Sequence, residues 1–372
     1  MNVLMARIRY WLVLVSVISV CTACPRPPDD TKPQLIQLEP MYFTILKKGN
    51  KVKVEDHDTG DLFAEAERHF AAGRPAEAKK LYDMVADNAA EAETRGLAWF
   101  NIALCELSME QPGAALTALQ KAEASSPGAD KQQVTLLKVQ AHAMAGQWQQ
   151  VDKLGKTLLK ETLEPVWAAK VNLYLGQSRY AEDLLDEAQD RYKKAIDLVL
   201  HNVSISAQYQ HSLLASAYFH LGQVYRRMFG KIQLLMPMER MSLDVPDKLA
   251  LMRKAEEVYL LALRVRDSKW SPRAGFQIGT LYEAFAMSLL QAEEPDTLTA
   301  YERQVYTEEL NKKVLPLLSR SREIHRKNVT MCETYLLRSP FKKKSRSKIA
   351  ALDKTIANLS RAIGPEEKMG NE

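Results

Sequence analysis

The chain has 372 residues, of which 46% are hydrophobic and 26% are charged, as is normal for a folded soluble protein. The 51 basic and 46 acidic residues leave a formal net charge of only +5. A charge this small does not indicate nucleic acid or an anionic membrane surface as the main partner, so we expect no nucleic-acid partner.

The amino terminus has the pattern of a bacterial lipoprotein signal. Arg7 and Arg9 precede an apolar run over residues 10–20, which is too short to span a bilayer. Small residues then precede Cys24, and cleavage there would leave Cys24 as the lipid-bearing first residue of the mature chain. Cys21 stands where lipoproteins prefer Leu, Val or Ile, so simple cleavage and an uncleaved anchor are the alternatives.

The next segment changes character twice. Residues 24–40 are rich in proline and predict an extended tether. Apolar residues follow from Met41, and Gly49-Asn50 is a typical turn sequence. Charged and apolar residues then alternate over Lys51–Glu55. This pattern predicts a small β-hairpin, followed by a polar linker.

A helical hairpin is predicted over Trp99–Pro127. Apolar residues recur at helical spacing on both sides of Pro112-Gly113, a dipeptide that interrupts a helix. Ala103 and Ala115 are small where the two helices would cross closely. These landmarks fall at the spacing of a tetratricopeptide repeat, so the unit resembles that family.

The same unit recurs along the chain. The small residues of the first helices are Ala66, Ala103, Val139 and Gly176, at separations of 37, 36 and 37 residues. Each is followed 12 residues later by the small residue of the second helix. The tetratricopeptide repeat is about 34 residues long, so the linkers here are slightly longer than the minimum.

Two later units keep both helices but hold insertions between them. Gly222 and Ala255 are 33 residues apart, and the insertion over residues 228–250 is rich in methionine. In the last unit an insertion over residues 288–312 precedes a second helix that resumes at Val314. Methionine provides adaptable apolar surface, so the first insertion either binds a partner or packs on its own repeat.

These elements predict an all-α, tetratricopeptide-like, right-handed α-solenoid of about six helix pairs, with a small β-hairpin in front. Stacked pairs would bury a continuous core and leave a concave groove lined by the first helices. The predicted organisation is signal peptide 1–23, tether 24–40, hairpin and linker 41–58, solenoid 59–346, and capping helix with polar tail 347–372.

The sequence carries no motif for catalysis or metal binding. P-loop, HExxH, GxSxG and paired CxxC zinc patterns are missing. The seven histidines are scattered, and His325 falls where the repeat requires a bulky packing residue. Cys105 and Cys332 are expected to be buried free thiols rather than a disulfide. We therefore expect no enzyme activity, no cofactor and no metal.

Two sets of polar residues are candidates for contacts with partners. On the groove side of the first helices, core packing does not require polar side chains, yet four polar residues stand there: Asn101, Asn172, Gln177 and Gln223. For each of them a solvated surface position is the alternative. A dense basic run in a predicted linker is a candidate contact for a polyanion or simply a solvated linker: Lys342, Lys343, Lys344 and Arg346.

The overall plan resembles tetratricopeptide envelope proteins of myxobacteria, some of which are linked to gliding motility. The likeness rests on the leading hairpin, the regular first repeats and the split last repeat. It implies a non-enzymatic scaffold, held to a membrane by the lipid on Cys24 and facing the periplasm, whose groove binds envelope proteins or peptides. The alternative is a structural lipoprotein that binds peptidoglycan or envelope polysaccharide.

Overall fold

A computed structural model of the chain describes residues 42–48, 51–57, 59–126, 130–201, 207–295 and 297–363. It divides into two compact units, residues 1–56 and residues 57–372. Strands β1 (Tyr42–Lys48) and β2 (Lys51–His57) pair in a two-stranded sheet. The predicted turn at Gly49-Asn50, the tether and Cys24 lie outside the described residues, so the hairpin and the lipid anchor stay predictions.

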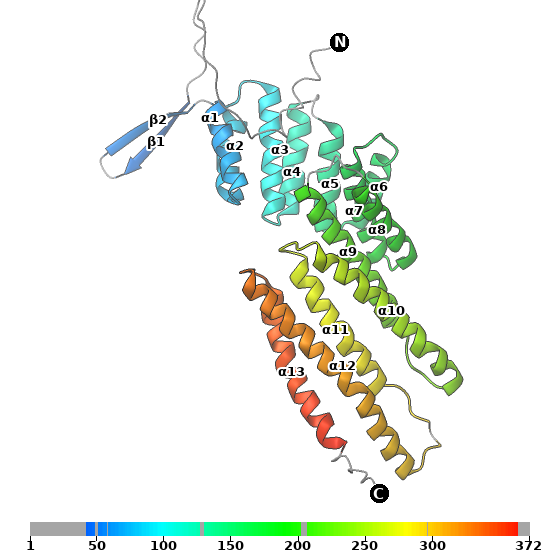
Figure 1. Cartoon of the computed structure of the whole chain (residues 1–372). Helices are drawn as coiled ribbons and strands as arrows, with labels where there is room; N and C mark the ends of the chain where they lie inside the picture. Colours follow the sequence, from blue (N-terminus) through cyan, green and yellow to red (C-terminus); the bar gives the residue numbers. More distant parts are fainter. Residues whose placement is uncertain are drawn as a thin grey trace, which may run out of the picture. The chain divides into compact units, whose positions relative to one another are not determined.

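The second unit is a succession of α-helices, each packed on its neighbours in the chain (Figure 1). In chain order they are α1 (Thr59–Ala71), α2 (Pro75–Asn88), α3 (Ala92–Ser108), α4 (Pro112–Ser125), α5 (Lys131–Met144), α6 (Trp148–Leu158), α7 (Pro165–Ala181), α8 (Leu185–Leu200), α9 (Ala207–Lys231), α10 (Met238–Arg264), α11 (Ser271–Leu290), α12 (Ala300–Thr334) and α13 (Pro340–Ala362). Within the described residues, α1–α12 form six consecutive pairs and α13 packs on α11 and α12. The predicted number of helix pairs is confirmed.

The first four pairs share one type of turn between their helices. In each turn one residue has a positive φ, of 72°, 60°, 70° and 62° in chain order, namely Gly73, Glu110, Gly146 and Asp183. At the second turn the Gln111 N–H donates to the Glu106 carbonyl at 2.8 Å, which is the Schellman ending of a helix. These four residues are again 37, 36 and 37 apart, so the turns reproduce the period of the small core residues.

Close packing inside a pair depends on a small residue facing a large one. Gly176 of α7 faces the buried ring of Tyr192 in α8, and Gly222 of α9 faces the buried ring of Tyr259 in α10. A β-carbon at Gly222 would lie 2.5 Å from Cε1 of Tyr259, closer than van der Waals contact allows. The large residue therefore fits only because the facing position has no side chain.

The Met-rich insertion is largely helical and packs on its own repeat. Most of it lengthens α9 and α10, and Phe229, Leu234 and Met241 are buried. The buried Lys248 amine donates to the carbonyls of Phe229 at 3.0 Å and Ile232 at 2.6 Å. Burial lowers the pKa of this lysine, and its two bonds tie α10 to the end of α9.

The last insertion and the basic run are also more helical than the sequence indicated. The second helix of the sixth pair, α12, begins 14 residues before Val314. The capping helix begins at Pro340 rather than at residue 347, and Ser339 caps it by accepting the Phe341 N–H at 3.3 Å. The prediction of a basic linker is therefore wrong, because the Ser-Pro start places residues 342–346 in the first turns of α13.

We expect Gly222→Ala to destabilise the folded chain by about 1–3 kcal/mol, because the new methyl group would overlap the immobile ring of Tyr259. The matched control is Gly113→Ala in α4, where a β-carbon meets nothing within 4 Å. That change should be neutral or stabilising, since alanine favours helix more than glycine does. Urea unfolding followed by circular dichroism measures both, and equal stability of the two variants would contradict the packing argument.

Candidate functional site

The four predicted groove residues occupy two different environments. Asn101, Gln177 and Gln223 are half-buried. Asn172 is fully buried, donates to the Ala168 carbonyl at 2.8 Å and accepts from Arg191 at 3.2 Å. The prediction that Asn172 contacts a partner is wrong for this structure, because its amide is enclosed in the α7–α8 pair.

Gln177 lies beside an aromatic cluster formed by residues of α8 and α9 and by the residue that precedes α11. Its Nε2 atom lies 3.2 Å from Nε2 of His220. The His220 ring stacks on Tyr192 at a centroid distance of 5.7 Å and meets Trp270 edge-on at 5.3 Å. Burial, with the positive charges of Arg273 and Lys269 nearby, lowers the pKa of His220 to about 4. Gln177 therefore lies beside a neutral histidine in a basic surrounding.

The basic run of α13 is partly neutralised. Lys342 and Arg346 both pair with Glu333 of α12. Lys344 instead lies over the ring of Phe341 at 4.8 Å. Residues 342, 343, 344 and 346 thus do not act as one uniform cationic surface, since two of them form ion pairs and one lies on an aromatic ring.

A buried polar cluster that the sequence pattern did not indicate joins the last three helices. His325 and Asn328 of α12 and Ser345 of α13 are all buried. Asn328 Nδ2 donates to Ser345 Oγ at 2.9 Å and to the Pro272 carbonyl at 3.1 Å, and His325 Nδ1 lies 3.3 Å from Ser345 Oγ. Ser345 is surrounded by basic residues in the sequence, so only the orientation of α13 reveals its role in docking that helix.

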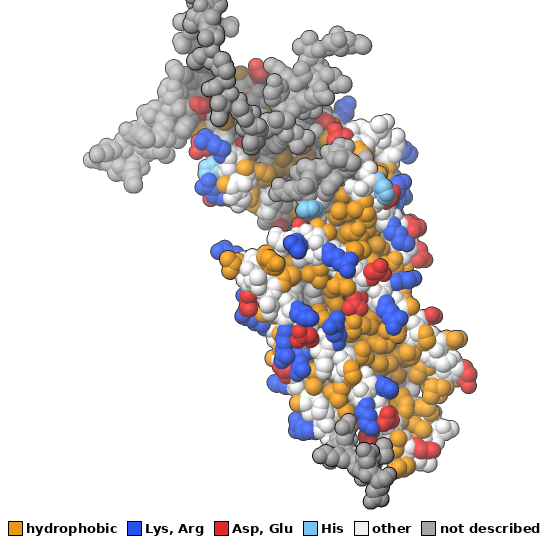
Figure 2. All heavy atoms as spheres, viewed as in Figure 1, with side chains coloured by type: hydrophobic (Ala, Val, Ile, Leu, Met, Phe, Trp, Pro, Cys, Tyr) orange, Lys and Arg blue, Asp and Glu red, His pale blue; other side chains and the backbone are white. Residues whose placement is uncertain are grey.

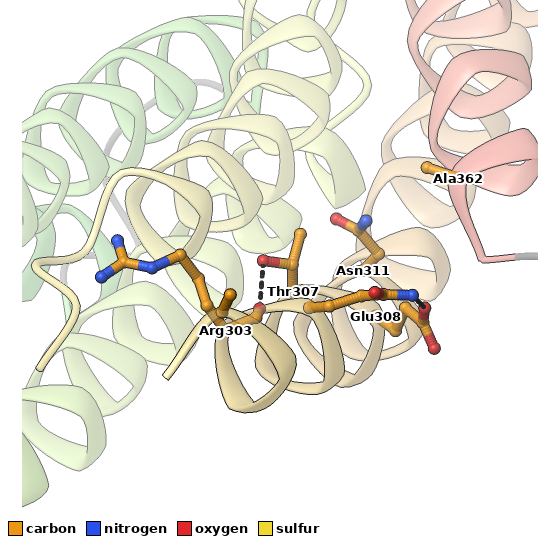
Figure 3. A pocket seen from close by; sticks show the side chains of 7 residues that line it. Arg303, Thr307, Glu308, Asn311 and Ala362 are labelled. Atoms are coloured by element: carbon orange, nitrogen blue, oxygen red, sulfur yellow. Dashed lines mark hydrogen bonds between the residues drawn. The ribbon is translucent and has the colours of Figure 1, made fainter. Parts of the chain in front are cut away.

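Two hollows on the described surface are open and shallow. One has a volume of about 390 Å³ and lies beside α12 and the end of α13 (Figure 3). There the Thr307 hydroxyl donates to the Arg303 carbonyl at 2.8 Å, and Glu308 accepts from Gln304 at 3.0 Å. The other, of about 430 Å³, is lined by residues of α1 and α3. Each has a single carboxylate in its lining, so neither pairs a general acid with a general base.

No group of three or more His, Cys, Asp or Glu side chains among the described residues could hold a metal ion. Nor does any helix among those residues have the length and apolar character needed to cross a membrane. Cys105 and Cys332 are both free and buried.

Comparisons with known proteins find similar folds but no family. No family model matches the chain, and no curated protein matches it. A tetratricopeptide protein of Cytophaga hutchinsonii, in its carboxyl-terminal part, is 11% identical over 82% of this chain and 100% of that chain, with a TM-score of 0.42. A signal transduction ATPase of Pyrococcus horikoshii with a tetratricopeptide sensor is 12% identical over 82% of this chain and 41% of that one, with a TM-score of 0.48.

A further similar structure is a chain of the Cut9–Hcn1 hetero-tetramer of the APC/C, which is 13% identical, with a TM-score of 0.47. The match covers 79% of this chain but only 43% of that one. The class of fold rests on the helix pairs themselves. Six helix pairs, with a glycine facing a large side chain in three of them and Schellman turns at a regular period in the first four, define a tetratricopeptide-like helical repeat array.

We expect His325 to make the folded chain sensitive to acid. Burial, with Lys348 nearby, lowers its pKa from 6.5 to about 4, so the folded state holds the neutral ring. This contribution to stability is complete above pH 6.5 and is lost as the pH falls toward 4. The loss of this contribution between pH 7 and pH 5 should lower the free energy of unfolding by about 2 kcal/mol.

The measurement compares unfolding by urea at pH 7 and pH 5. His325→Gln should lose less stability on acidification than the unmodified chain, because its side chain does not titrate. His211→Gln, at an exposed position of α9, is the control and should keep the original dependence on pH. An unchanged pH dependence in His325→Gln would show that this histidine is not the acid-sensitive group.

Proposed function

We propose that this protein is a non-enzymatic scaffold that binds other proteins of the bacterial cell envelope. The observation that carries the proposal is the array of six helix pairs with half-buried polar side chains on its first helices, at Asn101, Gln177 and Gln223. Stacked helical repeats present extended surfaces to their partners, and polar side chains there give a protein ligand directed hydrogen bonds.

The location in the cell is part of the same proposal. The basic start, the short apolar run and Cys24 support export and a lipid anchor, with the helical array facing the periplasm. Residues 24–40 would then act as the tether between the membrane and the rest of the chain. A role in assembling envelope complexes, including those of motility, follows from the resemblance described above.

The second candidate is a structural lipoprotein that binds peptidoglycan or envelope polysaccharide. The basic residues of α13 favour it, because they are the densest cationic group in the sequence. The ion pairs of Lys342 and Arg346 with Glu333 weigh against it, since these two cations already have an acidic partner. We therefore rank it second.

Cys24→Ala should move the protein from the membrane fraction to the soluble fraction of cells, because the acyl chains have no other point of attachment. Cys332→Ala is the control, and it should remain with the membranes because this buried thiol lies far along the chain. Sedimentation of cell lysates followed by immunoblotting measures both. A Cys24→Ala variant that still sediments with the membranes would contradict the anchor.

A photoreactive residue placed at Gln223 should form crosslinks to specific envelope proteins in living cells, because this half-buried position lies on a first helix. The same residue at the exposed Lys354 of α13 is the control and should give few adducts. Mass spectrometry identifies the captured proteins. Retention on purified peptidoglycan without any protein adduct at Gln223 would favour the second candidate.

A further inference from the structure

Cationic side chains lie over two aromatic rings where α11 and α13 begin. Arg273 lies over the Trp270 ring at 5.0 Å and over the Phe341 ring at 5.7 Å, between the two helices. Lys269 lies 5.5 Å from the centroid of Trp270, and Lys344 lies 4.8 Å from that of Phe341. We name these five residues the cation–aromatic ledge. On the face shown in Figure 2, many Lys and Arg side chains gather over the last helices.

The rings of the ledge are held by the core beneath them. Trp270 is only 9% exposed and packs on Phe219 at a centroid distance of 5.1 Å. Phe341 packs on Phe276 at 5.4 Å, and Phe276 in turn contacts the buried His325 at 5.3 Å. Both rings are therefore fixed, and a cation lying on them loses little further freedom when it binds a ligand.

The cations of the ledge have no acidic side chain paired with them among the described residues. No ion pair joins Lys269, Arg273 or Lys344 to a carboxylate in that part of the chain. The neighbouring Asp267 accepts the backbone N–H groups of Lys269 and Trp270, at 2.8 and 2.9 Å. Near the start of α13, the Glu333 carboxylate forms its ion pairs with Lys342 and Arg346.

The positive field of the ledge acts on its surroundings. His220 meets the Trp270 ring edge-on, and the charges of Arg273 and Lys269 help to lower the pKa of its imidazole. An opposing carboxylate near these two cations would weaken that effect. The ledge therefore presents positive charge that the described residues leave unneutralised.

We propose that the cation–aromatic ledge binds an acidic segment of a partner protein, with Arg273 holding a carboxylate and Lys269 and Lys344 flanking it. The inference rests on the proposed scaffold function and adds the chemistry of the ligand. A planar guanidinium donates two parallel hydrogen bonds to one carboxylate, and the rings leave apolar surface for the methylene groups of acidic side chains. Three separated cations suit carboxylates carried on separate side chains of a peptide better than the contiguous phosphates of a polyphosphate.

Binding of a fluorescein-labelled hexaglutamate peptide to the full chain, followed by fluorescence anisotropy, tests the proposal. Arg273→Gln should weaken binding about tenfold or more, and Arg273→Lys by less, because lysine keeps the charge but not the paired donors. The matched control is Arg361→Gln on the exposed surface of α13, which should bind like the unmodified chain. Thermal melts of the variants show whether each one is folded.

Competition identifies the class of ligand. Inorganic tripolyphosphate and phosphatidylglycerol vesicles should displace the peptide poorly, and a hexaglutamine peptide should not bind. Equal affinity of Arg273→Gln and Arg361→Gln for hexaglutamate would overturn the proposal, as would vesicles or tripolyphosphate that bind tightly through Arg273 when the peptide does not.

The same variants separate this inference from the scaffold function. Crosslinks from Gln223 that persist in Arg273→Gln cells, together with equal peptide affinity of the two variants, would overturn the ledge but leave the scaffold standing. Loss of those crosslinks in Arg273→Gln, but not in Arg361→Gln, would support both. A complete absence of protein adducts in the unmodified chain would overturn the scaffold function itself.

Discussion

The close crossing of two helices within each pair is the constraint on which this structure depends. A glycine or alanine on one helix lets a large residue of the other fill the space between them, as Gly222 does for Tyr259. The packed density of a protein interior leaves no room for a further methyl group there. One pair alone cannot bury its apolar face, so a closely packed pair becomes stable only when neighbouring pairs stack on it and cover that face.

The last two pairs use the same crossing but have longer helices around it. Gly279 of α11 faces His325 of α12, and the Ser321 hydroxyl donates to the Gly279 carbonyl at 2.8 Å. The insertions therefore extend a standard pair instead of interrupting it. Several polar atoms inside these longer pairs have partners on neighbouring elements. Lys248 of α10 donates to two carbonyls at the end of α9, and Asn328 Nδ2 of α12 donates to α11 and α13. Such bonds satisfy groups whose burial would otherwise be costly.

The polar chemistry divides into an interior set and a surface set. The interior set, with Asn172, His325 and Ser345, holds helices together and is closed to solvent. The surface set lies where the first turns of α11 and α13 bring Arg273 between two rings. The two sets thus have different roles, and burial decides between them. A scaffold needs both, because a rigid interior keeps the surface groups in position for a partner.

The sequence by itself determined the repeat, the small residues at the crossings, the number of helix pairs and the burial of His325, because these follow from spacing along one chain. Only the tertiary structure decided that Asn172 is enclosed, that the Met-rich insertion packs on its own repeat, and that Lys342 and Arg346 share Glu333. It also brought Trp270, Arg273 and Phe341 together from two helices that are distant in the sequence. Helical periodicity places a residue on a face, whereas its partners depend on which other helix covers that face.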